Sequence, residues 1–219
     1  MTPTAAVFDV MGTLFDLAPL RARFARAGAP ELALDVWFAR TLHGATSLTL
    51  AGEFAPFGEI ARSTLASTLA RLDLDPADAD QLAAALGDLE PFPDAEPALA
   101  RISAAGVRIW TLTNGDAEHT RGLLERGGLL PYVEEIATVS EVERYKPHGD
   151  VYRRALERLE LAPHEACLVA AHAWDTVGAR AAGMRAIWVD RLERVWPLPV
   201  PETERAASLE EAAAILFAS

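Results

Sequence analysis

The 219-residue sequence is poor in cysteine and has no long apolar run. Its single cysteine, Cys167, excludes an internal disulfide and a metal site made of cysteines alone. Because Cys167 stands among the apolar residues Ala166, Leu168 and Val169, we expect a buried and inert thiol. No stretch approaches the roughly 18 apolar residues of a membrane-spanning helix, so no membrane span is expected.

Basic residues are also scarce, with 20 Lys and Arg against 32 Asp and Glu and a net charge of -12. Nucleic acid binding needs a basic face, so this balance argues against such a partner. It leaves an anionic small substrate open, because local donors decide that question. The N-terminus shows no basic segment followed by an apolar stretch and a cleavage site, so no signal peptide is expected. Together these features predict a soluble cytoplasmic protein.

Hydrophobic residues make up 51% of the chain, enough for one large domain or for a core with a smaller insert. From Phe92 onward, short apolar strands alternate with helices, which is typical of βαβ units and a parallel sheet. Residues 16–90 show helical spacing instead, with breaks expected at 48–52 and 54–57. We therefore predict a Rossmann-like α/β core with a helical insert after the first strand.

The individual elements follow from the same patterns. Strands are expected over residues 5–8, 107–112, 135–139, 166–170 and 185–189. Helices are expected over residues 95–104 with Asp94 as the N-cap, 117–125, 149–159, 174–182, and from about Ser208 to the C-terminus. The proline-rich stretch 196–201 is excluded as a central strand.

Asp9 stands at the end of the first apolar strand. In an open α/β sheet the ligand crevice lies outside the carboxyl ends of the strands, which places Asp9 where chemistry would occur. The alternative is that Asp9 merely begins a helix as its N-cap. Gly12 and Thr13 follow directly, and they favour a tight loop over a first helical turn.

Polar side chains follow four of the predicted strands. They are Asp9 with Thr13, then Thr113, Asn114 and Gly115, then Lys146 with Pro147, and finally His172 with Asp175. Each group has a purely structural alternative: a turn for Thr113 and Asn114, a surface charge for Lys146, a helix cap for Asp175 and a core histidine for His172. Their coincidence at one edge of the sheet favours a functional site.

In chain order, the motifs Asp-x-x-Gly-Thr-Leu-Phe-Asp, Leu-Thr-Asn-Gly, Tyr-Lys-Pro and Ala-Trp-Asp resemble the haloacid dehalogenase superfamily. The L-2-haloacid dehalogenase branch is the most similar, over the whole chain. The resemblance implies a core domain of residues 1–15 and 91–219 and a helical cap domain of residues 16–90. It also implies Asp9 as the nucleophile, Lys146 as its partner and Asp175 as the residue that positions or activates water. The further site residues that it implies are Thr13, Thr113, Asn114, Tyr152 and Trp174.

Met11 bears on the type of reaction. Phosphatases of the superfamily carry an aspartate two residues after the nucleophile as a general acid, and methionine cannot transfer a proton. Ala171 stands where their second metal-binding carboxylate is expected, and a Mg²⁺ site commonly needs more than one carboxylate. We therefore predict attack on carbon without a metal or other cofactor. A Mg²⁺-dependent phosphatase and a non-catalytic binding or oligomerisation protein on the same fold are the alternatives.

The chain departs from the dehalogenase pattern on the leaving-group side. Ala170, Ala171 and His172 replace hydroxyl and asparagine side chains, and an imidazole is larger and can donate a hydrogen bond or carry charge. Phe38 follows Trp37 where the family has a halide-binding arginine. Arg40 lies two positions further on, turned by about 200° on a helix. Asn114, His172 and ring edges would then hold the halide, which predicts a small halide site.

The resemblance thus implies hydrolytic dehalogenation of small 2-haloalkanoic acids to 2-hydroxy acids with inversion. Backbone amides and a hydroxyl near Met11, Gly12 and Thr13 would hold the substrate carboxylate. Asp9 would attack C2, and water oriented by Asp175 and Lys146 would open the resulting ester. The expected partner is a small-molecule 2-haloacid, with neither nucleic acid nor membrane. Because family members are often dimers, the resemblance also suggests a homodimer.

Overall fold

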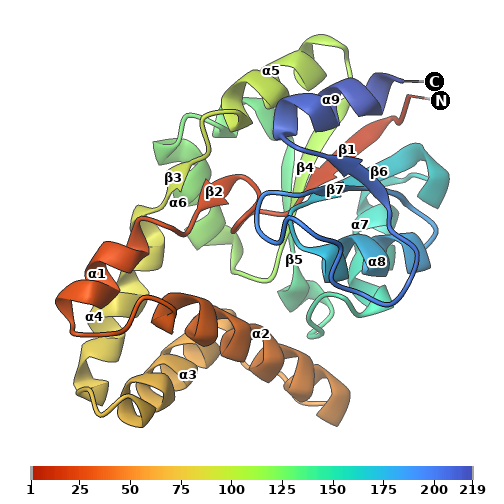
Figure 1. Ribbon diagram of the computed structural model, residues 1–219. Coiled ribbons are helices and arrows are strands. Elements are labelled where there is room, and N and C mark those ends of the chain that lie inside the picture. The colour runs from red at the N-terminus through yellow and green to blue at the C-terminus, as the bar shows by residue number, and fades with distance from the viewer. Residues whose placement is uncertain (1, 219) are drawn as a thin grey trace. The chain divides into compact units, whose positions relative to one another are not determined.

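The computed structural model describes residues 2–218 (Figure 1). The chain divides into two compact units. The smaller unit is Asp16–Leu89, and the larger one combines the segment that ends at Phe15 with the segment that begins at Glu90. Among the residues described, no helix is long and apolar enough to cross a membrane.

A six-stranded parallel sheet forms the centre of the larger unit. Its strands, in spatial order, are β5 (Glu135–Thr138), β4 (Arg108–Thr113), β1 (Ala5–Phe8), β6 (Ala166–Ala170), β7 (Arg185–Val189) and β8 (Glu204–Ala206). Every residue of β1 and β6 is buried, as expected for strands covered on both faces. Two-residue strands β2 (Phe15–Asp16) and β3 (Glu90–Pro91) lie outside this sheet.

The strand order reverses at β1, which lies between β4 and β6. Phe8 is in register with Thr111 on one side and Val169 on the other. The three strands therefore end at nearly the same level, and the residues that follow them meet at one edge. Such a switch point is where ligands bind in open α/β sheets.

Five helices cover this sheet. They are α5 (Ala95–Ala104), α6 (Ala117–Arg126), α7 (Gly149–Leu159), α8 (Ala173–Ala181) and α9 (Leu209–Phe217), with 3₁₀ turns η3 (Leu130–Tyr132), η4 (Val139–Glu141) and η5 (Pro163–Glu165). Helix α5 packs along α9, and α7 packs beside α8 (Figure 1). Right-handed crossovers on either side of β1 place α5 on one face of the sheet and both α7 and α8 on the other, and α9 packs with α5. The predicted α/β class with a parallel sheet is confirmed.

The smaller unit is helical. It contains α1 (Leu20–Arg26), α2 (Ala33–Ala51), α3 (Phe57–Arg71) and α4 (Ala79–Ala84), with 3₁₀ turns η1 (Pro76–Asp78) and η2 (Ala85–Asp88). Helices α2 and α3 lie side by side (Figure 1). Trp37 Nε1 donates to the Ala61 carbonyl at 2.9 Å, and the hydroxyls of Thr41 and Thr64 lie 2.7 Å apart. These buried polar contacts fix how the two helices pack together.

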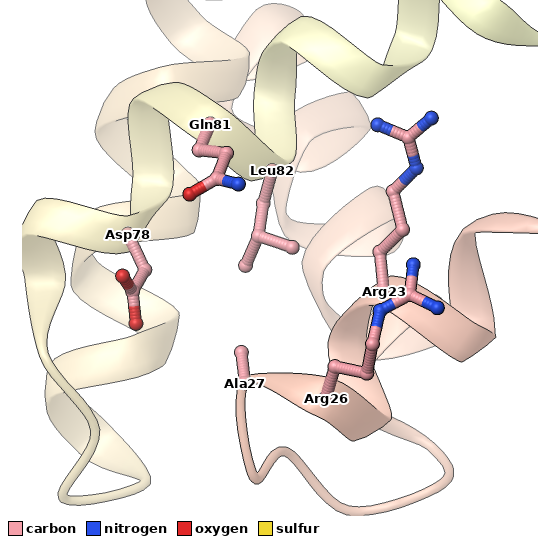
Figure 2. A pocket seen from close by; sticks show the side chains of 6 residues that line it. All are labelled: Arg23, Arg26, Ala27, Asp78, Gln81 and Leu82. Carbon is pink, nitrogen blue, oxygen red and sulfur yellow. The ribbon is translucent and has the colours of Figure 1, made fainter.

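A cavity of about 370 Å³ lies within the smaller unit. Residues of α1 and its C-terminal end face residues of η1 and α4 across it (Figure 2). The lining residues are Arg23, Arg26, Ala27, Asp78, Gln81 and Leu82. Arg23 is already paired with Asp88 at 2.6 Å, so part of its positive charge is neutralised.

Three details of the predicted elements are wrong. The break expected at residues 48–52 is absent, because α2 continues to Ala51 and ends at Gly52 with a φ of 78°. Asp94 occupies the predicted N-cap position of α5, but its side chain makes no capping hydrogen bond, since its Oδ2 accepts from Arg191 at 2.6 Å and from Leu209 N at 2.8 Å. Strand β8 was not predicted, because two of its three residues are exposed and it lacks an apolar signal.

Candidate active site

Asp9 follows β1, and a tight turn brings Thr13 back to its carboxylate. The turn is closed by Leu14 N donating to the Val10 carbonyl at 2.8 Å, with Gly12 at a φ of 79°. Thr13 Oγ1 then donates to Asp9 Oδ2 at 2.7 Å and accepts from Ala171 N at 2.9 Å. The hydroxyl therefore links the loop after β1 to the loop after β6.

Lys146 lies between two carboxylates. Its Nζ donates to Asp9 Oδ1 at 2.8 Å, to Asp175 Oδ2 at 2.7 Å and to the Leu112 carbonyl at 2.8 Å. All three ammonium donors are thus used, and none of the side chain is exposed. The surface-charge alternative for Lys146 is wrong.

Asp175 is held from the other side by Tyr152, whose hydroxyl donates to Asp175 Oδ1 at 2.6 Å. Tyr152 lies on α7 and Asp175 in the first turn of α8. The two helices approach closely at Gly178, where a Cβ would lie 2.5 Å from the Tyr152 hydroxyl and 2.7 Å from Pro147 Cβ. Glycine at this position lets Tyr152 reach the carboxylate. The N-cap position of α8 belongs to His172, so the helix-cap alternative for Asp175 is wrong.

The surroundings of Asp9 and Asp175 shift the pKa values of the two carboxyl groups in opposite directions. Burial alone would raise the pKa of Asp9, but the charge of Lys146 and the hydrogen bond from His172 outweigh it and the pKa is lowered. For Asp175 burial prevails over the charge of Lys146, and the nearby charge of Asp9 adds to it, so its pKa is raised. Two neighbouring carboxylates with pKa values pushed apart are suited to different roles. Asp9 is therefore the weaker base of the two carboxylates and Asp175 the stronger base.

Lys146 and Tyr152 stay protonated in this cluster. Burial lowers the pKa of Lys146, but the charges of Asp175 and Asp9 overcome it and the net pKa is raised. Burial and the charge of Asp175 raise the pKa of Tyr152 well above its ordinary value. The cluster therefore contains one fixed cation and one fixed neutral donor beside the two carboxylates.

His172 is the second donor to Asp9 Oδ2, with its Nδ1 at 3.1 Å. Its ring centroid lies 5.1 Å from the ring of Trp174. On its other side a Cβ at Gly12 would lie 3.0 Å from His172 Cε1 and 3.2 Å from Leu192 Cδ1. The absence of a side chain at Gly12 thus gives the imidazole its place against Asp9.

Thr113 and Asn114 follow β4 and support the site through the backbone. Thr113 Oγ1 accepts from Gly115 N at 3.0 Å, and Asn114 Oδ1 accepts from Lys146 N at 3.1 Å. Asn114 therefore fixes the main chain of the residue whose ammonium binds Asp9. Thr113 is almost fully buried, whereas Asn114 is partly exposed.

Several donors of the predicted carboxylate-binding loop are engaged within the protein itself. Gly12 N donates to the Phe15 carbonyl at 2.8 Å and Thr13 N to the Val10 carbonyl at 3.3 Å. The Thr13 hydroxyl is also engaged at both its donor and acceptor sides. These hydrogen bonds close the turn, and the binding of a substrate carboxylate by this loop stays a prediction. Met11 is partly exposed beside them.

Phe38 and Arg40 belong to the smaller unit, on α2. Arg40 is half-buried, and its Nη2 donates to Ser67 Oγ on α3 at 2.8 Å. Its guanidinium is therefore directed to the helix that α2 packs against. Phe38 is half-buried.

The donor set fits a divalent cation poorly. Lys146 occupies the position between Asp9 and Asp175, and all four carboxylate oxygens already accept hydrogen bonds. Met11 and Ala171 offer no side-chain oxygen. Among residues 2–218, no group of three His, Cys, Asp or Glu side chains is arranged to hold a metal ion.

The sequence contains two signals for this site that the sequence analysis did not use. Lys146 is the only lysine in the chain, although there are 20 basic residues. Its compact ammonium has three donors, which match the three acceptors around it, and arginine is not interchangeable with lysine at such a place. Gly178, three residues after Asp175, is the second feature. Its signal was a glycine inside a helix, which lowers helix stability unless packing requires it.

Comparison with known proteins agrees with this site. A model of the haloacid dehalogenase-like hydrolases matches residues 3–183. The chain is 32% identical to (S)-2-haloacid dehalogenase 1 of Pseudomonas sp. (strain CBS-3), over 97% of this chain and 96% of that protein. It is also 32% identical to the (S)-2-haloacid dehalogenase of Xanthobacter autotrophicus, covering 87% of this chain and 76% of that one.

A solved structure is similar over almost its full length. It is the L-2-haloacid dehalogenase of Xanthobacter autotrophicus with chloropropionic acid covalently bound, at a TM-score of 0.88 and 25% identity, covering 98% of both chains. The chain belongs to the haloacid dehalogenase-like hydrolases. Within that family its similarity is to the (S)-2-haloacid dehalogenases.

Proposed function

We propose that this protein is a hydrolytic (S)-2-haloacid dehalogenase that forms an ester on Asp9. The observation that carries the proposal is the buried cluster in which Lys146 joins Asp9 to Asp175. An ionised carboxylate with an adjacent ammonium can bind and attack an anionic haloacid, whereas the same charge set lacks the carboxylates that a phosphatase metal needs.

In the first half-reaction, an Asp9 oxygen forms a bond to C2 of the haloacid. The carbon–halogen bond breaks on the opposite side, and its electron pair leaves with the halide. The lowered pKa of Asp9 keeps the attacking group ionised at neutral pH. Attack from behind inverts C2, so an (S)-2-haloacid gives an (R)-2-hydroxy acid.

In the second half-reaction, water attacks Cγ of the esterified Asp9. Asp175 is assigned the proton of that water, because its raised pKa makes it the more basic carboxylate of the pair. As the tetrahedral intermediate collapses, the bond from Cγ to the substrate-bearing oxygen breaks and that oxygen takes the proton held by Asp175, so that the 2-hydroxy acid leaves and Asp9 is restored. Tyr152 and Lys146 hold Asp175 in place through hydrogen bonds to its two oxygens.

Asn114 is proposed as a substrate donor. Its Oδ1 is used by Lys146 N, so the side chain is oriented with its Nδ2 available to an anion. Asn114 is the only asparagine in the chain, so protein labelled with ¹⁵N-asparagine has one side-chain amide pair. We expect that pair to shift when a slowly reacting 2-haloacid or the product 2-hydroxy acid binds.

Halide preference tests the leaving-group side. His172 and Trp174 are proposed to leave room only for a small halide, because the imidazole stands beside Asp9. We expect halide release from fluoro- and chloroacetate to be favoured relative to bromoacetate. Equal or better turnover of bromoacetate would contradict the small pocket.

The ester route is tested by incubating the enzyme with a 2-haloacid in ¹⁸O water. After several turnovers, mass spectrometry should find the label in the peptide that contains Asp9. Asp9→Asn should release no halide, with Asp16→Asn as a control for the loss of a neighbouring carboxylate. Label that reaches only the product in the first turnover would refute an ester on Asp9.

We also propose a homodimer in the cytoplasm. The sequence supports the location through its lone cysteine, because proteins of oxidising compartments commonly carry disulfides. Light scattering of the purified protein would give the mass of the assembly, and a monomer at micromolar concentration would contradict the dimer.

A further inference from the structure

We propose that His172 and Thr13 form an oxyanion hole on Asp9 Oδ2 that acts when the Asp9 ester is hydrolysed. The inference rests on the proposed function and assigns His172 to the second half-reaction instead of to the halide. The two oxygens of Asp9 then have different roles: Oδ1 attacks the substrate, and Oδ2 becomes the ester carbonyl oxygen.

The hydrogen bonds around Asp9 are unequal. Oδ1 accepts from Lys146 at 2.8 Å, while Oδ2 accepts both from Thr13 at 2.7 Å and from His172 at 3.1 Å. Donors at about 2.7–3.1 Å are the geometry that stabilises a developing oxyanion. An oxygen that already accepts two hydrogen bonds is also the weaker nucleophile of the pair.

His172 can serve only as a donor toward Asp9. A carboxylate with a lowered pKa is ionised and has no proton to give, so Nδ1 of His172 carries the hydrogen of this contact. Thr13 is likewise fixed as a donor to Oδ2, because its oxygen accepts from Ala171 N. Both hydrogens therefore point at the same oxygen.

The imidazole is held before any substrate arrives. Gly12 leaves room for it on one side, where an added Cβ would be only 3.0 Å from Cε1. The ring of Trp174 lies on another side, at a centroid distance of 5.1 Å. His172 is 8% exposed. Donors fixed in a buried site stabilise charge without reorganising during the reaction.

The charge changes of the two steps favour this assignment. During ester formation Asp9 loses its negative charge, so two donors on Oδ2 give no advantage to the attack. During hydrolysis water adds to Cγ and the carbonyl electron pair moves onto Oδ2. When that pair re-forms the carbonyl, the Cγ–Oδ1 bond breaks and Oδ1 leaves in the 2-hydroxy acid. The oxygen from water stays on Asp9.

This role and a halide-binding role predict opposite kinetics. If His172 held the halide, its removal would slow ester formation, lower kcat/KM and leave the enzyme free of ester. If His172 belongs to the oxyanion hole, its removal slows hydrolysis. Then kcat falls, kcat/KM is nearly unchanged and the Asp9 ester accumulates during turnover.

The test compares wild type, His172→Ala and His172→Asn by rapid quench with chloroacetate, followed by peptide mass spectrometry. Loss of one oxyanion donor costs about 10²–10³ in kcat in a well-studied protease. For His172→Ala we expect a fall in kcat of about that order, less than tenfold change in kcat/KM, and most of the enzyme as ester. His172→Asn keeps a short donor and should recover part of kcat.

His164→Ala is the matched control, because His164 is exposed in η5, before β6 and at the opposite end of that strand. It should leave both half-reactions unchanged. An equal fall in kcat and kcat/KM without ester in both His172 variants would overturn the inference. If wild type itself forms no Asp9 ester, the proposed function fails and not only the role of His172. Circular dichroism of each variant checks that it is folded.

Discussion

Lys146 Nζ lies 2.8 Å from Asp9 Oδ1 although the two residues are 137 positions apart in the sequence. Lys146 lies in the connection that leads from β5 to β6, whereas Asp9 follows β1, and neither partner is more than marginally exposed. A buried ion pair of this kind is weak evidence for stability, because both charges lose their hydration. The burial of this ion pair beside a second carboxylate is better explained by a role in catalysis than by a gain in stability.

The protonation state of Lys146 can be measured directly because it is the only lysine. Protein labelled with ¹³C at lysine Cε has one side-chain signal to titrate. We expect its pKa to lie above the ordinary value of about 10.4, since the charges of Asp175 and Asp9 outweigh the effect of burial. Asp175→Asn should lower that pKa. A midpoint at or below about 10.4 in the wild type would contradict this electrostatic account.

The same raised pKa predicts how stability depends on alkaline pH. The contribution of Lys146 is complete below its unfolded pKa and is lost as the pH rises through its folded pKa. Urea unfolding between about pH 9 and 12 should therefore show a falling free energy of unfolding in wild type. In Lys146→Met this part of the pH dependence should be missing.

Lys146→Met should also be less stable near neutral pH. It leaves Asp9 and Asp175 buried without their cation, and breaking a buried pair on one side costs about 3–5 kcal/mol. Halide release should be lost as well. Arg62→Met removes an exposed charge on α3 and is the matched control, expected within about 0.5 kcal/mol of wild type. A Lys146→Met protein as stable as wild type would show that the carboxylates can be neutralised at little cost.

The site could be predicted from the sequence because polar residues follow the ends of the predicted strands. The register of β1 with β4 and β6 brings Asp9, Asn114 and His172 to one edge, as the alternation of strands and helices suggested. Lys146 was harder to place, because η4 and a loop separate it from the end of β5. Its position depends on contacts with Asn114 and Leu112 that no local pattern reveals.

The loop after β1 shows why local hydrogen bonding could not be predicted from the sequence. A glycine and a threonine after an aspartate are compatible with free backbone donors or with a closed turn. In the structure the turn is closed, because the amides of Gly12 and Thr13 donate to the carbonyls of Phe15 and Val10. Asp94 stands at the predicted N-cap position, but Arg191 and Leu209, both about a hundred residues away, bind its carboxylate in place of the first turn of α5. Long-range hydrogen bonds of this kind override local capping preferences.

Gly178→Ala should disturb the site without touching a charged group. The new Cβ would lie 2.5 Å from the Tyr152 hydroxyl, so Tyr152 must move away from Asp175. We expect loss of stability of about 1–3 kcal/mol from overpacking and a fall in kcat. Gly58→Ala on α3 is the matched control, because its Cβ would have no neighbour within 4 Å. Wild-type kcat in Gly178→Ala would show that the contact between Tyr152 and Asp175 is not required.

Cys167 should be unreactive in the folded protein. It is fully buried in β6, and burial raises the pKa of its thiol to about 12, so almost no thiolate forms at neutral pH. A chromogenic disulfide reagent should label no thiol in native protein and one thiol per chain in urea. The result bears on the ester experiments, because haloacids also alkylate thiols. Cys167→Ala combined with His172→Ala should accumulate the same Asp9 ester as His172→Ala alone. Loss of the mass increase in the double variant would instead place the substrate-derived group on the Cys167 sulfur.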